Sequence, residues 1–154
     1  MKLEEIMVKE VITASPEDNT ASTAKRMREK GVGCLVVTID RAIKGILTDR
    51  DLLGCLSEGH NPYECKVSTH MSRPVVIEGP KEELLSAAEV MAQRKINRLP
   101  VADDGKLMGI VSFSDISRVM HEQAQTFWPA WVSMTGLIRA QALHCRSKAH
   151  GRAP

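Results

Sequence analysis

The chain has 154 residues, of which 43% are hydrophobic, and a formal net charge of +2 at pH 7. This length allows one good-sized core or two small cores packed together, and so small a net charge gives no reason by itself to expect binding to nucleic acid or membrane. No stretch reaches the roughly 18 consecutive apolar residues of a membrane span, and no apolar signal segment is apparent, so we expect a cytoplasmic protein.

The first predicted strand and helix lie between residues 11 and 30. Val11-Ile12-Thr13 is a short β-rich run, and Pro16 follows it and sets up a helix. From Thr20 to Lys30 apolar residues recur at helical spacing, and Gly31 is placed to end the helix. The Met and Ala residues of this face are predicted to pack in the core rather than contact a ligand.

Two strands and a second helix are predicted next. The apolar run Cys34–Ile39 indicates a strand buried on both faces. The turn at residues 40–44 lacks a glycine, so we expect a looser or differently shaped hairpin there. The following stretch, Gly45-Ile46-Leu47-Thr48-Asp49-Arg50-Asp51, predicts a strand that runs directly into a helix, with Thr48 as the N-cap and Asp51 in the first turn.

This stretch has two interpretations. Thr48 and Asp51 have the spacing of a capping box, in which two side chains satisfy the start of a helix. The same groups suit a nucleotide, because helix-start N–H groups and a hydroxyl hold phosphate while a carboxylate accepts both ribose hydroxyls. The repetition of the motif favours the nucleotide, and Arg50, inside the motif, is a better phosphate candidate than Arg98.

The motif returns 64 positions later as Gly109-Ile110-Val111-Ser112-Phe113-Ser114-Asp115. Sliding residues 6–56 onto residues 70–120 without a gap also matches Met7 with Met71 and Val37 with Val101. Self-similarity at a fixed spacing indicates one supersecondary unit used twice. Each copy is predicted to form strand, helix, strand, strand, helix. In the second copy we expect a lead-in strand at Val75-Val76-Ile77 and a helix from about Glu82 to Arg94. A strand at residues 99–102 and a clear hairpin turn at residues 103–106 follow.

The doubled Gly-apolar-apolar-Thr/Ser-x-x-Asp element resembles a tandem pair of cystathionine β-synthase (CBS) domains, over roughly residues 1–121. The resemblance implies an α/β (α+β) fold in which two β-α-β-β-α repeats, residues 1–60 and 61–121, pack together. Residues 122–154 remain as a C-terminal tail that is helical or partly disordered. CBS pairs are regulatory modules that commonly bind adenine nucleotides and form homodimers, so both properties are implied for this chain.

The resemblance also implies a set of ligand-binding residues. Asp51 or Asp115 would take the ribose hydroxyls, and Thr48 or Ser112 the phosphate or sugar. Residues of the two lead-in strands would flank the base, and the backbone near Arg98 and its counterpart would edge the adenine pocket. The full set is Thr13, Cys34, Thr48, Arg50, Asp51, Ile77, Arg98, Ser112 and Asp115.

Simpler roles remain open for two members of this set. Cys34 lies in an apolar segment and is also expected to pack. The resemblance implies that Arg98 can reach a phosphate, but it is equally well explained as a solvated arginine at a strand end. Arg50 has Ser114 as its counterpart in the second motif. If each motif forms part of a cleft that binds a ligand, the cleft at the first motif is therefore expected to favour a more highly phosphorylated ligand.

The predicted function is a sensor that binds AMP, ADP, ATP or S-adenosylmethionine and regulates an unidentified protein. No nucleophile–base set and no Walker-type loop is present, so we expect neither an enzyme nor a catalytic cofactor. Two alternatives remain open. One is a ligand-free dimerisation or interaction scaffold, and the less favoured one is a nucleic-acid-binding regulator that works through the basic aromatic tail.

Four residues spaced by five invite a metal hypothesis, because thiolate and imidazole are the ligands that zinc prefers. They are Cys55, His60, Cys65 and His70. This spacing is not usual for structural zinc, and Cys55 aligns with Val119 in the repeat, so packing is its expected role and no metal site is predicted. The cysteines are expected to be free thiols.

The tail from His121 onward follows no part of the repeat. It holds an aromatic cluster, Phe127-Trp128-Pro129 with Trp131, and it has basic residues but no acidic residue after Glu122. The cluster is predicted to dock on its own module or a second subunit, to recognise a partner, or to touch an anionic surface. The last dozen residues are expected to be disordered.

Overall fold

The computed structural model describes the backbone of residues 1–135 and the side chains of residues 1–124. It divides into two compact units, Met1–Ile116 and Ser117–Pro154. Helix α6 (Phe113–Thr135) begins in the first unit and continues in the second. The remaining elements all lie in the first unit: α1 (Leu3–Ile6), β1 (Thr13–Ala14), α2 (Thr20–Lys30), β2 (Cys34–Ile39), β3 (Ala42–Thr48), α3 (Asp49–Ser57), α4 (Val67–His70), α5 (Leu84–Arg94), β4 (Arg98–Asp103) and β5 (Lys106–Ser112).

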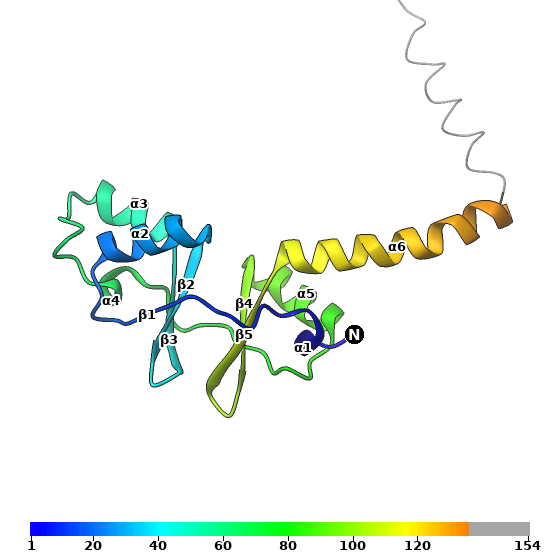
Figure 1. Cartoon of the computed structure of the whole chain (residues 1–154), viewed down its shortest axis with the longest axis horizontal. Coiled ribbons are helices and arrows are strands. Elements are labelled where there is room, and N and C mark those ends of the chain that lie inside the picture. The colour runs from blue at the N-terminus through cyan, green and yellow to red at the C-terminus, as the bar shows by residue number, and fades with distance from the viewer. Residues whose placement is uncertain (136–154) are drawn as a thin grey trace, which may run out of the picture. The chain divides into compact units, whose positions relative to one another are not determined.

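The five strands form one mixed sheet in the order β1-β2-β3-β5-β4 (Figure 1). Strand β1 pairs with β2 in parallel, and the other neighbours are antiparallel. The fold is therefore mixed α and β, as predicted. The hairpins of the two repeats meet at the pair Ala42 and Lys106, in the middle of the sheet.

The second repeat lacks its predicted lead-in strand. Residues 75–77 form no strand, and only Glu78 makes a single parallel bridge to Val101. In the first repeat the N–H of Val36 donates to the carbonyl of Ile12 at 3.3 Å. The matching residue in the second repeat is Pro100, which has no N–H to donate. The prediction of a strand at 75–77 was therefore wrong.

Both hairpins close with the same two-residue turn. Asp104 and Gly105 have φ values of 46° and 74°, and Asp40 and Arg41 have φ values of 50° and 67°. These are the left-handed conformations that a type I′ turn requires. The first hairpin is thus not looser, contrary to the expectation from its missing glycine. Arg41 is held from the other repeat, because its carbonyl accepts from Leu107 N at 3.0 Å and its guanidinium donates to Leu107 O at 3.1 Å.

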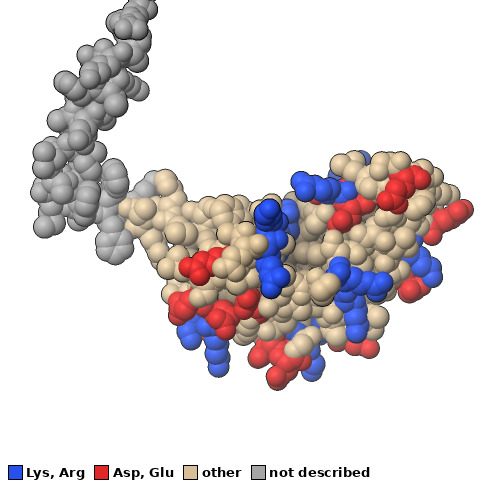
Figure 2. All heavy atoms as spheres, turned by 180° about the vertical axis from the view of Figure 1, so that it is seen from behind, with Lys and Arg blue, Asp and Glu red and all other residues tan. Residues whose placement is uncertain are grey.

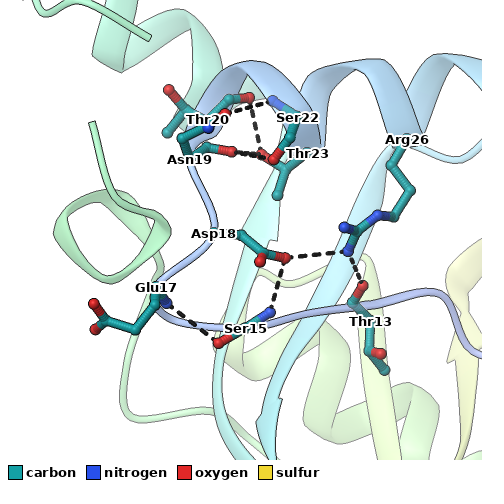
Figure 3. Close-up of polar contacts among 9 residues, drawn as sticks. All are labelled: Thr13, Ser15, Glu17, Asp18, Asn19, Thr20, Ser22, Thr23 and Arg26. Carbon is teal, nitrogen blue, oxygen red and sulfur yellow. Dashed lines mark hydrogen bonds and ion pairs between the residues drawn. The ribbon is translucent and has the colours of Figure 1, made fainter. Parts of the chain in front are cut away.

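The turn between β1 and α2 is fixed by a polar network (Figure 3). One carboxylate oxygen of Asp18 accepts from Ser15 N at 3.1 Å and from Arg26 Nη1 at 3.3 Å. The same guanidinium nitrogen donates to the carbonyl of Thr13 at 2.6 Å. Asn19 caps α2 by accepting from the N–H of Ser22. This network holds the end of β1 against α2.

Each repeat is completed by a short helix that comes just before the other repeat in the chain. Helix α1 packs on the second repeat, and helix α4 packs on the first. The N–H of Leu3 donates to Glu82 O at 3.0 Å, which places α1 on the second repeat. The N–H of Val67 donates to Asp18 O at 2.8 Å, which places α4 on the first repeat. Figure 1 shows this exchange, with α1 near α5 and β5 and with α4 near α2 and α3. Leu3 and Val67 are both fully buried.

The exchanged segments explain two glycines of the repeated motif. A Cβ atom on Gly45 would lie 2.5 Å from Met71 Sδ, and one on Gly109 would lie 2.5 Å from Met7 Sδ. Neither distance leaves room for a methyl group. The methionines recur with the glycines in the sequence because each methionine lies on the glycine of the other repeat.

The aromatic cluster of the tail lies outside the residues whose side chains are described. The backbone of α6 is helical to Thr135, which confirms the helical part of the predicted tail. The expected disorder of the last dozen residues concerns residues outside the described part of the chain. Within the part that is described, no helix is long and apolar enough to cross a membrane. Acidic and basic side chains are intermixed over the face drawn in Figure 2, in keeping with the small net charge.

Candidate functional site

A cleft of about 330 Å³ lies where the first motif meets the approach to β4. Its volume is in the range of small-molecule sites. Residues of both repeats line it, so a ligand there would contact the two halves at once. The lining residues are Ile46, Thr48, Asp49, Arg50, Asp51, Ser72, Lys95, Ile96, Asn97 and Arg98.

Thr48 and Asp51 form the capping box at the start of α3. The backbone N–H and the hydroxyl of Thr48 both donate to Asp51 Oδ2 at 2.7 Å, and the N–H of Asp51 returns a longer bond to Thr48 Oγ1. The capping interpretation is therefore confirmed. It does not exclude ligand binding, because among the described residues no hydrogen bond reaches Oδ1 of Asp51.

The first three N–H groups of α3 already have acceptors. Asp49 N donates to Gly33 O at 3.2 Å, Arg50 N donates to the Asp49 carboxylate at 2.9 Å, and Asp51 N donates to Thr48. A helix start normally offers such groups to phosphate. Here an anion would displace existing bonds, so its recognition falls to side chains.

Three basic side chains line the cleft, two of them from the second repeat. Arg50 comes from α3, Lys95 from the end of α5 and Arg98 from the start of β4. Asp49 and Asp51 are the acidic groups among the lining residues. The basic groups outnumber the acidic ones by one, so the lining carries a net positive charge that suits an anion.

Arg98 lies against the first repeat. A Cβ atom on Gly33 would be 3.0 Å from Arg98 Nη2 and 3.3 Å from Asp49 Oδ2. Cys34, the next residue, pairs with Thr48 across β2 and β3. Burial raises the pKa of the Cys34 thiol, while the positive charge of Arg98 lowers it and the negative charge of Asp49 raises it. Cys34 is thus a neutral thiol beside Thr48 in the sheet, close enough to Arg98 and Asp49 to feel their charges.

The second motif repeats the capping geometry. Ser112 N and Ser112 Oγ donate to Asp115 Oδ2 at 3.0 and 2.5 Å, and Ser112 Oγ also bonds to Ser114 Oγ at 2.7 Å. The N–H of Phe113 donates to the carbonyl of Asn97, a lining residue of the first cleft. The start of α6 is therefore tied by a hydrogen bond to the wall of that cleft.

The structure brings together only part of the predicted ligand set. Thr48, Arg50, Asp51 and Arg98 line one cleft, and Cys34 pairs with Thr48 in the sheet without lining the cleft itself. Thr13 lines a separate cavity of about 180 Å³ together with Lys9, Val11, Thr38, Arg41 and Leu107. Ile77 is exposed and is not among the lining residues of the 330 Å³ cleft.

Sequence reasoning missed Ser72, Lys95 and Asn97 as lining residues. Ser72 enters the cleft because the exchanged segment pairs with β3 at Ile46. A signal for Lys95 was present in the sequence. It occupies the position that Gly31 has in the first repeat, where a glycine suits the left-handed end of a helix.

A wider depression of about 780 Å³ adjoins the cleft and shares Asp49 and Arg50 with it. Met27, Val32 and Leu52 give this depression an apolar wall. The two hollows together offer charged groups and an apolar surface to one ligand.

Comparison with known proteins identifies two matches to the family model described as CBS domain, at residues 3–58 and 67–122. Uncharacterized protein MK0525 of Methanopyrus kandleri is 39% identical over 118 residues, which cover 75% of this chain and 60% of that protein. The chain thus spans less than two thirds of that relative. The CBS domain-containing protein YhcV of Bacillus subtilis is 34% identical, with 75% of this chain and 82% of that protein covered.

Two similar solved structures hold adenosine compounds. The CBS domain pair of protein MJ0100, solved with 5′-methylthioadenosine and S-adenosyl-L-methionine, has a TM-score of 0.73 and 25% identity, covering 80% of this chain and 98% of that one. CBSX2 in complex with AMP has a TM-score of 0.71 and 26% identity, covering 79% and 96%.

Proposed function

The chain belongs to the CBS domain family and carries two copies of the domain, and from this we propose that it is a regulatory sensor whose first cleft binds an adenosine-containing ligand. The observation that carries the proposal is the convergence of the Thr48–Asp51 motif with Lys95 and Arg98 of the other repeat in one cleft. Similar CBS pairs hold AMP or S-adenosylmethionine with 5′-methylthioadenosine.

Each group of the cleft has a proposed part. Oδ1 of Asp51 accepts the ribose hydroxyls, while Oδ2 stays in the capping box. Arg50, Lys95 and Arg98 hold the phosphates. The apolar wall that includes Leu52 receives the base. Thr13 and Ile77, which we expected beside the base, are kept as candidates for a second cleft at Ser112 and Asp115.

The number of basic groups indicates which ligand is preferred. A monophosphate carries about two negative charges and a triphosphate about four, so three cations favour ADP or ATP over AMP or S-adenosylmethionine at this cleft. The second motif has Ser114 in place of Arg50. A ligand at the second cleft is therefore proposed to carry less phosphate.

Binding at the first cleft clamps the two repeats together, because its walls come from both. A ligand shifts such an equilibrium only if it binds one arrangement more tightly than another. We propose that this shift is transmitted to a regulated protein and that the chain itself catalyses no reaction. A homodimer and a cytoplasmic location are part of the same proposal.

Thermal unfolding tests the proposal directly. AMP, ADP, ATP, S-adenosylmethionine and NAD are added in turn, with GMP as the control for base selectivity. A ligand at a hundred times its dissociation constant adds about 2.7 kcal/mol, which raises the midpoint by roughly 5–10 °C for a domain of this size. A selective increase is expected, largest for ADP or ATP. No increase with any of them would favour the interaction scaffold.

Substituting the two motif carboxylates separates binding from capping. Asp51→Asn removes a charge-assisted hydrogen bond worth about 1.5–3 kcal/mol, so affinity at the first cleft is expected to fall roughly ten- to a hundredfold. Stability without ligand should change by only a few tenths of a kcal/mol, because asparagine still accepts the capping bonds. Asp115→Asn is the matched variant at the second cleft. Unchanged calorimetric affinity in both variants would contradict the proposed role.

A further inference from the structure

Four residues with metal-binding side chains converge beside the linker between the repeats. They are Cys55 of α3, His60 and Cys65 of the linker and His70 at the end of α4. Their ligand atoms all lie within 4.8 Å of one another. In the described part of the chain, no other group of three or more His, Cys, Asp or Glu residues meets this condition.

Three of the four ligand atoms are separated by about the distances expected between ligands of one metal ion, and Cys55 Sγ lies within 4.8 Å of each of them. His70 Nε2 lies 3.0 Å from Cys65 Sγ, His60 Nδ1 lies 3.3 Å from His70 Nε2, and Cys65 Sγ lies 3.9 Å from His60 Nδ1. Tetrahedral zinc, with bonds of about 2.3 Å to sulfur and about 2.0–2.1 Å to nitrogen, places its ligand atoms about 3.3–3.8 Å apart. The two imidazole rings are tilted by 56° with centroids 5.4 Å apart, so they are not stacked face to face.

The backbone already holds the ligands near this arrangement. His60 N donates to Cys55 O at 3.2 Å, and Thr20 N donates to Cys65 O at 2.9 Å. The hydroxyl of Thr20 bonds to Pro62 O at 3.0 Å and lies 3.4 Å from Cys55 Sγ. A hydrogen bond to a thiolate is the outer-sphere support that metal sites typically have. The linker is therefore anchored on the start of α2 by bonds that do not need the metal.

The burial of the four residues suits a site with an open route for the ion. Cys55 is fully buried, Cys65 and His70 are half-buried and His60 is exposed. A depression of about 260 Å³, lined in part by His60 and Cys65, opens on their outer side. Glu58 Oε2 lies 3.5 Å from His60 Nδ1, so a carboxylate also faces the cluster.

We propose that Cys55, His60, Cys65 and His70 bind one zinc ion that fastens the linker between α3 and α4. Two thiolates and two imidazoles in tetrahedral arrangement are the ligand set that zinc favours over magnesium or calcium, and the thiolates balance its charge. His70 directly precedes Met71, which lies on Gly45, and Ser72, which lines the first cleft. The ion thus fixes the residue that directly precedes Met71 and Ser72, the segment that completes this cleft.

Metal analysis of the full chain tests the proposal without any nucleotide. Protein purified under reducing conditions is stripped with a chelator, reloaded with zinc and dialysed. We expect one zinc ion per chain by mass spectrometry of the metal content. Cobalt loaded in place of zinc is expected to give the intense visible absorption of a tetrahedral thiolate site. Zinc at a hundred times its dissociation constant should raise the unfolding midpoint by roughly 5–10 °C.

Two variants change ligands that are not fully buried, so the fold is expected to survive. Cys65→Ser and His60→Gln should each lose the retained zinc and the tetrahedral cobalt spectrum. Cys34→Ser is the matched thiol control, because Cys34 lies outside the cluster, and it should keep one zinc ion. No zinc retained by the wild-type chain, an octahedral cobalt spectrum, or normal zinc content in both ligand variants would overturn the proposal.

Discussion

Lys95 adopts a left-handed backbone conformation, with φ of 55°, at the position where the first repeat has Gly31. A non-glycine residue held there costs of order 1 kcal/mol, and such residues concentrate where a side chain serves a function. The lysine side chain lines the first cleft beside Arg50 and Arg98. The second repeat thus gives up the residue that best ends a helix and gains a positive charge at the cleft.

Lys95→Gly separates these two effects. Relief of the left-handed strain is expected to leave the free energy of unfolding unchanged or raise it by up to about 1 kcal/mol. Loss of the charge should weaken triphosphate binding by roughly tenfold, the effect of one charge-assisted hydrogen bond, and AMP binding by less. Urea unfolding and calorimetric titration measure both quantities. Lys95→Arg keeps the charge and is the control; equal triphosphate affinity in the glycine variant would exclude a role for Lys95.

At the scale of elements, the contact between β3 and the segment after α4 is set by one glycine. Gly45 is not among the glycines with positive φ, so its backbone is open to any residue. Only the approach of Met71 forbids a side chain there, because a Cβ atom would lie 2.5 Å from Sδ and 3.1 Å from the methionine Cβ. The need for glycine is therefore imposed by a neighbouring element and not by the strand itself.

Gly45→Ala is expected to destabilise the chain by about 1–3 kcal/mol through overpacking against Met71. In Gly45→Ala/Met71→Ala the loss should be smaller than the sum of the two single losses, because the clash is removed. Gly54→Ala is the control, since no atom lies within 4 Å of its Cβ position and helix α3 gains about 0.5–1 kcal/mol there. Strictly additive losses in chemical unfolding would show that the contact is not what limits Gly45.

At the scale of the whole described unit, the exchange of α1 and α4 links the two repeats. Leu3 is buried on the second repeat and Val67 belongs to the hydrophobic core of the first, with Met27, Leu35 and Leu47. The core of each repeat is completed by a short helix that belongs, in sequence, to the other repeat. Residues 1–116 are accordingly one compact unit, although the sequence contains two copies.

The exchange predicts that both repeats unfold together. Leu3→Ala should cost about 2–5 kcal/mol and Val67→Ala about 1–3 kcal/mol, as expected for fully buried side chains. In each variant, hydrogen exchange should speed up in both repeats, including the one that does not contact the substituted residue. Leu85→Ala, on a side chain that is 62% exposed, should stay within about 0.5 kcal/mol of the wild type. Two separate unfolding transitions would contradict this view.

Local patterns predicted much of the fold. The 64-residue spacing identified the two repeats, and the bounds of α2 and β2 match the predicted ranges. Capping by Thr48 and the turn at Asp104-Gly105 followed from residue chemistry that acts over a few positions. The missed features depend on partners far along the chain. Pro100 has no N–H to donate to the segment at 75–77, and Leu107 N donates to the carbonyl of Arg41 in the glycine-free turn.

The candidate sites divide in the same way. The sequence alone identified Thr48, Arg50 and Asp51 as candidate ligand-binding residues. A strand-to-helix junction with a hydroxyl, a cation and an acid is a local pattern, so it can be recognised without the fold. Only the tertiary structure decided that Lys95 and Ser72 join them, and that Cys55 and His70, fifteen positions apart, converge with His60 and Cys65. Spacing along a chain constrains distance only within one element. Across a linker and an exchanged segment, packing sets which side chains meet.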